Sequence, residues 1–126
     1  MNKYEYPDGE AAISVLEKLG TDISNIYLDQ DCEYILADET QLNKYIELYQ
    51  HSDTKNLEKR VLGCFIIQSI TDLLPNNISE NEVRLFLGIL VKDYKIHTTE
   101  FEYWSIGEDE NEEHWFHVTK YIREII

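Results

Sequence analysis

Positive charge is scarce in this sequence, and two long stretches have none. The chain has 25 Asp and Glu residues against 11 Lys and Arg residues, a formal net charge of −14 over 126 residues. No Lys or Arg occurs between Lys18 and Lys44 or between Lys95 and Lys120. Nucleic acids and anionic membranes are bound through clustered basic side chains, so this shortage argues against both as partners.

Several other features are also absent. The two cysteines, Cys32 and Cys64, are too few and too far apart for a disulfide framework or a CxxC metal site. The five glycines occur singly, and no P-loop, GxGxxG, GxSxG or HExxH motif is present. The chain has no secretory signal and no apolar run of about 18 residues. We therefore expect a cytoplasmic protein that is not an enzyme and holds no cofactor and no metal.

The apolar pattern predicts a helical body. Hydrophobic residues make up 43% of the chain, enough for one domain spanning residues 1–126 to bury a core. Their spacing predicts helices at 9–19, 39–50, 55–74, 80–94 and 119–126. The helix at 55–74 is apolar over too wide an arc for a surface helix, so it is expected at the centre, antiparallel to the helix at 80–94. Asp38 with Gln41, and Ser79 with Glu82, have the form of capping boxes.

Two segments favour β-structure instead. Residues 26–28 and 32–36 are β-prone runs that flank an acidic turn, which predicts a small hairpin. Residues 98–104 alternate acids with aromatics, and residues 115–118 would return as the second strand of another hairpin. The expected fold class is therefore α+β, predominantly helical, with a central antiparallel helix pair and one or two hairpins; an all-α fold is the alternative.

The two stretches without basic residues suggest a binding surface. Carboxylates displayed on loops beside Tyr and Trp side chains are typical of a tight interface with a basic protein. The predicted partner-binding residues are Tyr27, Asp29, Asp31, Glu33, Glu108, Asp109, Glu110, Glu112, Glu113 and Trp115. Trp104 is expected in the core, as is Cys64.

Other interpretations remain open. The acids of residues 108–113 would also suit a solvated loop that only keeps the protein soluble. A small adaptor that presents an apolar groove, with exposed apolar residues on the 80–94 helix, is the alternative function. A third is a metal-assisted hydrolase in which His114 and His117 bind the metal.

Three features resemble bacterial immunity proteins of contact-dependent growth inhibition and related polymorphic toxin systems. They are the segment Asp53-Thr-Lys-Asn-Leu57-Glu-Lys-Arg-Val61-Leu-Gly-Cys-Phe65, the run Phe101-Glu-Tyr103-Trp104, and the small acidic single-domain format. The resemblance covers residues 53–126 loosely. It implies a protein that binds the C-terminal domain of a cognate toxin, often a nuclease with a basic cleft, and neutralises it by stoichiometric binding.

Overall fold

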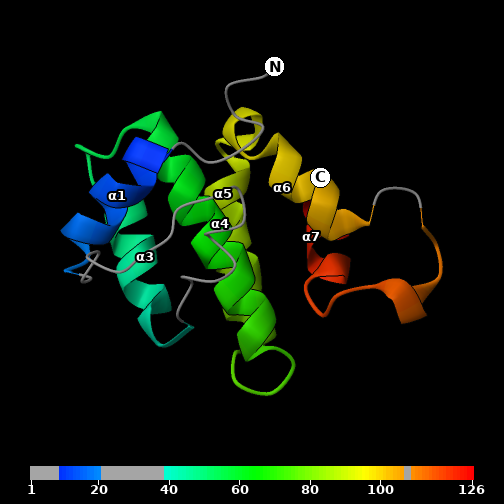
Figure 1. Cartoon of the computed structure of the whole chain (residues 1–126). Helices are drawn as coiled ribbons and strands as arrows, with labels where there is room; N and C mark the ends of the chain where they lie inside the picture. Colours follow the sequence, from blue (N-terminus) through cyan, green and yellow to red (C-terminus); the bar gives the residue numbers. More distant parts are fainter. Residues whose placement is uncertain (1–8, 21–38, 107–108) are drawn as a thin grey trace.

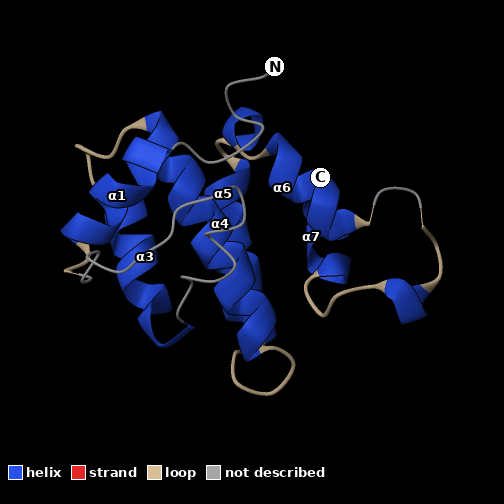
Figure 2. Cartoon of the chain, viewed as in Figure 1, coloured by secondary structure: helices blue, strands red, loops and turns tan. Residues whose placement is uncertain are grey.

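The computed structural model describes residues 9–20, 39–106 and 109–126, and within these ranges every regular element is a helix (Figures 1 and 2). The α-helices are α1 (Gly9–Lys18), α3 (Leu42–Tyr49), α4 (Asn56–Leu73), α5 (Glu80–Val91), α6 (Thr98–Ser105) and α7 (Thr119–Ile125). Short 3₁₀ turns cover Glu39–Gln41, Tyr94–Ile96 and Glu112–His114. The predominantly helical prediction is confirmed, and each predicted helix is present within a few residues of its expected bounds.

Helix α4 lies at the centre of the fold, as its apolar arc predicts. It packs against α1 and α3 on one side and runs antiparallel to α5, while α6 and α7 lie beyond the α4–α5 pair (Figure 1). Its fully covered side chains include Val61, Leu62, Phe65, Ile66, Ile67 and Ile70. Cys64 is buried among them, as expected. Burying several large apolar side chains on one helix supplies roughly 1.5–3 kcal/mol for each, the main driving force of this fold.

Local signals explain where several helices begin and end. The Ser79 hydroxyl accepts a hydrogen bond from the Glu82 amide at 3.1 Å, so the predicted capping box starts α5. Leu74 has an extended backbone before Pro75, which ends α4. Gly20 follows α1 with a φ of +75°, a conformation that glycine adopts without a Cβ penalty.

A buried ion pair fastens α6 to α4. The Arg60 Nε donates to both carboxylate oxygens of Glu100, at 2.9 and 3.1 Å, and Cys64 Sγ lies 3.4 Å from the same carboxylate. Arg60 is 1% exposed and Glu100 is 4% exposed. Two buried charges are tolerated because they share this forked geometry.

The strand expected at residues 98–104 is wrong, because this segment forms α6. In a strand, Phe101 and Tyr103 would share one face. Instead Phe101 and Trp104 point into the core while Tyr103 is 54% exposed, which is a helical pattern. Burial of Phe101 and Trp104, together with the Glu100 ion pair, outweighs the β-propensity of the aromatic and Thr residues.

The returning strand expected at residues 115–118 is also wrong: this segment is an irregular link into α7. Thr119 ties the link to α6, because its hydroxyl accepts from the Phe116 amide and donates to the Trp104 carbonyl at 2.8 Å. The hairpin expected at 26–36 lies outside the described residues. The described ranges hold no strand, so the all-α alternative fits them and the hairpin at 98–118 is excluded.

Candidate functional site

The acidic segment, Asp109–Trp115, is fastened to the body by Arg123 of α7. The Arg123 guanidinium donates to the carbonyl oxygens of Ser105, at 2.8 Å, and of Asp109. It also lies over the Trp115 ring, 4.2 Å from the centroid. Trp115 closes the segment, because its indole Nε1 donates to the Asp109 carbonyl at 2.9 Å. The Arg123 guanidinium therefore contacts both ends of the acidic segment, at Asp109 and at Trp115.

Within the acidic segment the carboxylates have different roles. Asp109 Oδ1 accepts from the Asn111 amide at 2.9 Å, so this side chain shapes the turn. Glu110 forms an ion pair with Arg123 at 3.3 Å and is thereby partly neutralised. Glu112 and Glu113 are exposed, and neither pairs with a Lys or Arg in the part of the chain that the structure describes. Glu112 and Glu113 therefore carry charge that no Lys or Arg of the described residues compensates.

Aromatic side chains adjoin the acidic segment. The Tyr103 ring of α6 stacks on Phe116, with centroids 5.7 Å apart, and Phe116 meets the buried Trp104 at 4.6 Å. Tyr103 is 54% exposed, and Trp115 is half-buried. The chain thus presents exposed carboxylates in the acidic segment and, through the adjoining Phe116, a supported and exposed aromatic ring; such a ring suits the centre of a protein interface, and carboxylates suit its polar rim.

The structure describes half of the predicted partner-binding residues. Asp109, Glu110, Glu112, Glu113 and Trp115 lie in the acidic segment, and their role in binding stays a prediction. Tyr27, Asp29, Asp31, Glu33 and Glu108 lie outside the described residues. The sequence did not single out Tyr103 as exposed, because a strand would have placed it beside Phe101.

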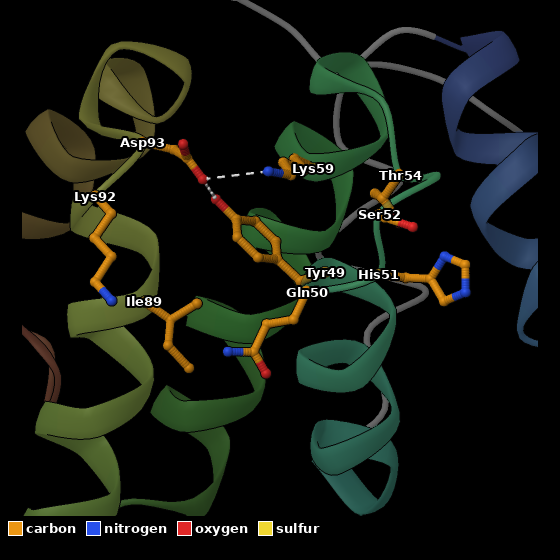
Figure 3. Close-up of a pocket in the computed structure, with 9 residues that line it drawn as sticks. All are labelled: Tyr49, Gln50, His51, Ser52, Thr54, Lys59, Ile89, Lys92 and Asp93. Carbon is orange, nitrogen blue, oxygen red and sulfur yellow. Dashed lines mark hydrogen bonds and ion pairs between the residues drawn. The ribbon is translucent and has the colours of Figure 1, made fainter.

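A second feature is a cavity of about 430 Å³ between the end of α3, the start of α4 and the end of α5 (Figure 3). We name it the lysine pocket; its lining residues are Tyr49, Gln50, His51, Ser52, Thr54, Lys59, Ile89, Lys92 and Asp93. The Tyr49 hydroxyl donates to Asp93 Oδ2 at 2.7 Å, and Lys59 Nζ lies 3.7 Å from the same oxygen. One carboxylate thus joins α3, α4 and the end of α5.

Behind Tyr49 lies a fully buried histidine, His97, whose Nε2 is 2.7 Å from the Tyr49 oxygen. Since the single Tyr49 proton goes to Asp93, the His97 Nε2–H is the donor in this contact. Burial lowers the pKa of His97 to about 4 and, together with Asp93, raises the pKa of Tyr49 above its usual range. Both groups are therefore neutral near pH 7. The two hydrogen bonds, from His97 to Tyr49 and from Tyr49 to Asp93, hold Asp93 in position.

Sequence reasoning missed the lysine pocket. Tyr49 fitted the apolar stripe of α3, and His97 stood alone between two predicted elements. The two side chains meet across 48 residues, and Tyr49 meets Asp93 across 44. No local spacing signals a pairing of that range.

Two other predicted features have limited support in the structure. Leu85 of α5 is 61% exposed, whereas Leu87 and Leu90 are fully buried, so this helix exposes one leucine, a common surface feature. The side chain of His114 is outside what the structure describes, and the described residues contain no cluster of three metal-ligating side chains. Among the described helices none has the length and apolar character needed to span a bilayer.

Comparisons with models of protein families, with curated proteins and with solved structures found no match to this chain.

Proposed function

We propose that this protein is an immunity-type inhibitor that captures a cationic toxin domain through the acidic segment and Tyr103. The observation that carries the proposal is the pair Glu112 and Glu113, exposed and without a basic partner among the described residues. Uncompensated carboxylates attract a basic protein over several ångströms and orient it during encounter.

The surrounding structure supports a role in tight binding. Arg123 and Trp115 fix the segment before a partner arrives, so little conformational entropy is lost on association. Tyr103 offers a large exposed ring already supported by Phe116. Preformed aromatic anchors beside charged rims typically carry most of the binding energy at an interface. Inhibition then requires occupancy of the toxin domain and no turnover.

The resemblance to immunity proteins names the partner to test, the C-terminal domain of a toxin encoded beside this gene. Co-purification and titration of the two proteins should give a one-to-one complex in which the toxin is inactive. Failure of the protein to bind or protect against that domain would refute the proposal.

A charge-reversal pair tests the binding surface itself. Glu112→Lys with Glu113→Lys should weaken binding by about tenfold or more, because two attractive charges become repulsive at the interface. The matched control is Glu17→Lys with Glu47→Lys, which reverses two exposed acids on α1 and α3 and changes the net charge equally. Equal affinities for the two double variants would mean that net charge alone, and not the acidic segment, attracts the partner.

A further inference from the structure

The lysine pocket has features that the proposed function does not use. It lies between α3, α4 and α5, whereas the acidic segment joins α6 to α7 (Figures 1 and 3). Its volume of about 430 Å³ falls in the range of small-molecule sites. Tyr49 and Ile89 supply apolar wall, and the polar lining residues come from α4, from the link between α3 and α4, and from the end of α5. The pocket therefore needs its own explanation.

Lys59 is the central group of the pocket. Its side chain is 26% exposed, and its Nζ lies 3.7 Å from Asp93 Oδ2 and 5.4 Å from the Tyr49 ring centroid. Both contacts are too long for a hydrogen bond, so within the described chain the ammonium has neighbours but no hydrogen-bond acceptor. A largely covered ammonium is stabilised when an anionic acceptor approaches it.

Lys92 adds a second ammonium to the same cavity, from the end of α5. Among the described residues that line the pocket, Asp93 is the one carboxylate that opposes the two lysines, and its Oδ2 already accepts from Tyr49. The cavity is thus locally positive on a protein whose net charge is −14. The hydrogen bond from Tyr49, whose hydroxyl also contacts His97, holds Asp93 beside Lys59.

We propose that the lysine pocket binds a small organic oxyanion, a phosphate or a carboxylate, held by Lys59 and Lys92 against the wall formed by Tyr49 and Ile89. The ammonium groups supply charge-assisted hydrogen bonds, and the aromatic and aliphatic wall accommodates the rest of the molecule. Binding at this site is independent of the acidic segment.

The test is an NMR titration of the isotope-labelled full chain with phenyl phosphate and, separately, with benzoate, at constant ionic strength maintained with chloride. Saturable shifts confined to the amides of the pocket residues are expected for at least one of the two probes, and the stronger binder identifies the preferred oxyanion. Shifts that do not saturate, or that spread over lysines throughout the chain, would overturn the proposal.

Two variants locate the binding. Lys59→Gln and Lys92→Gln should each weaken it by about tenfold, the effect of losing one charge-assisted hydrogen bond. Lys92 is exposed, so its replacement leaves the core intact and keeps the test valid even if Lys59→Gln unfolds the chain. Lys44→Gln, an exposed lysine on α3 outside the pocket, is the matched control and should bind as the parent does. Equal binding by the Lys92 and Lys44 variants would contradict the assignment.

This result is separable from that of the proposed function. Capture of a toxin domain would fail on charge reversal in the acidic segment, whereas oxyanion binding would survive it.

Discussion

Gly63 of α4 leaves the space that the ring of His97 occupies. A Cβ at position 63 would lie 2.5 Å from Cε1 and 2.6 Å from Nδ1 of that ring. The ring is fully buried and held by Tyr49, so it has no room to withdraw. A glycine inside a helix normally makes that helix less stable. Here Gly63 lets α4 approach His97, which precedes α6, and this packing offsets the loss of helix stability.

Gly63→Ala should therefore destabilise the protein by about 1–3 kcal/mol, as overpacking of a core does. Gly88→Ala is the matched control, because nothing lies within 4 Å of a Cβ built there on α5. That substitution should be neutral or stabilising by up to about 1 kcal/mol, the helix-propensity difference. Urea unfolding of both variants measures the free energies. Equal stability of the two would refute the close contact at position 63.

Acid should weaken the fold through His97. Its pKa is about 4 in the folded protein and about 6.5 unfolded, because burial disfavours the charged ring; nearby Arg60 and Lys59 lower it further, while Asp93 opposes them. Between these pH values the unfolded chain binds a proton that the folded chain does not. The free energy of unfolding thus falls as pH drops from about 6.5 to about 4, by up to about 3 kcal/mol.

His97→Gln should remove this component, which urea unfolding at pH 7, 5.5 and 4.5 would detect as a shallower pH dependence. Carboxylates such as Glu58 are present in both proteins, so their contribution to the pH dependence is shared. Burial raises the pKa of Glu58, but hydrogen bonds from Lys18, the Lys55 amide and Ser14 lower it overall. His51→Gln, at an exposed position, is the control and should keep the parent's pH dependence. Identical pH profiles for His97→Gln and the parent would contradict the assignment.

Breaking the buried ion pair should cost more than any surface change. Glu100→Gln leaves the buried Arg60 charge without its carboxylate, and a loss of about 3–5 kcal/mol is expected. Glu102→Gln, the exposed neighbour on the same helix, should change stability by less than about 0.5 kcal/mol. Thermal unfolding followed by circular dichroism would compare them. A near-neutral Glu100→Gln would show that the pair does not hold α6 in place.

Arg123 should control the conformation of the acidic segment. Arg123→Ala removes the donors to the Asp109 and Ser105 carbonyls and the cation over Trp115, so the segment should lose its fixed conformation. Hydrogen exchange at the Trp115 indole and the Glu113 amide should accelerate, while α4 amides stay protected. Lys120→Ala, also on α7, is the control. Unchanged exchange in Arg123→Ala would mean that other contacts hold the segment.

Salt should slow association with the proposed toxin-domain partner more than it speeds dissociation. Exposed charges such as Glu112 and Glu113 are screened beyond about 8–10 Å near physiological ionic strength. The association rate constant should fall as salt rises, and the fall should be shallower for Glu112→Gln with Glu113→Gln. Stopped-flow measurements over a salt series would show this. An association rate that does not depend on salt would remove the electrostatic basis of the proposal.

The described α-helices other than α6 could be predicted because their signals are local. The apolar spacing of α3 and α5, the capping box at Ser79 and the stop before Pro75 all act within a few residues, so the chain nearby already contains the information. The all-round apolar character of α4 likewise predicted its central position. The clustering of acids in residues 109–113 was visible for the same reason.

Tertiary structure decided the features in which partners lie far apart along the chain. Arg60 meets Glu100 across 40 residues, and that ion pair, with burial of Phe101 and Trp104, turned a β-prone segment into α6. The hydrogen bonds that join Tyr49 to Asp93 and to His97, beside the lysine pocket, connect residues 44 and 48 positions apart in the sequence. For the described helices other than α6, residue type and periodicity determine which segments form helices and which side chains favour burial. Which buried groups contact one another depends on how the helices pack. A hydrogen bond or ion pair between two elements produces no pattern of residue spacing within either element, so the sequence does not reveal it.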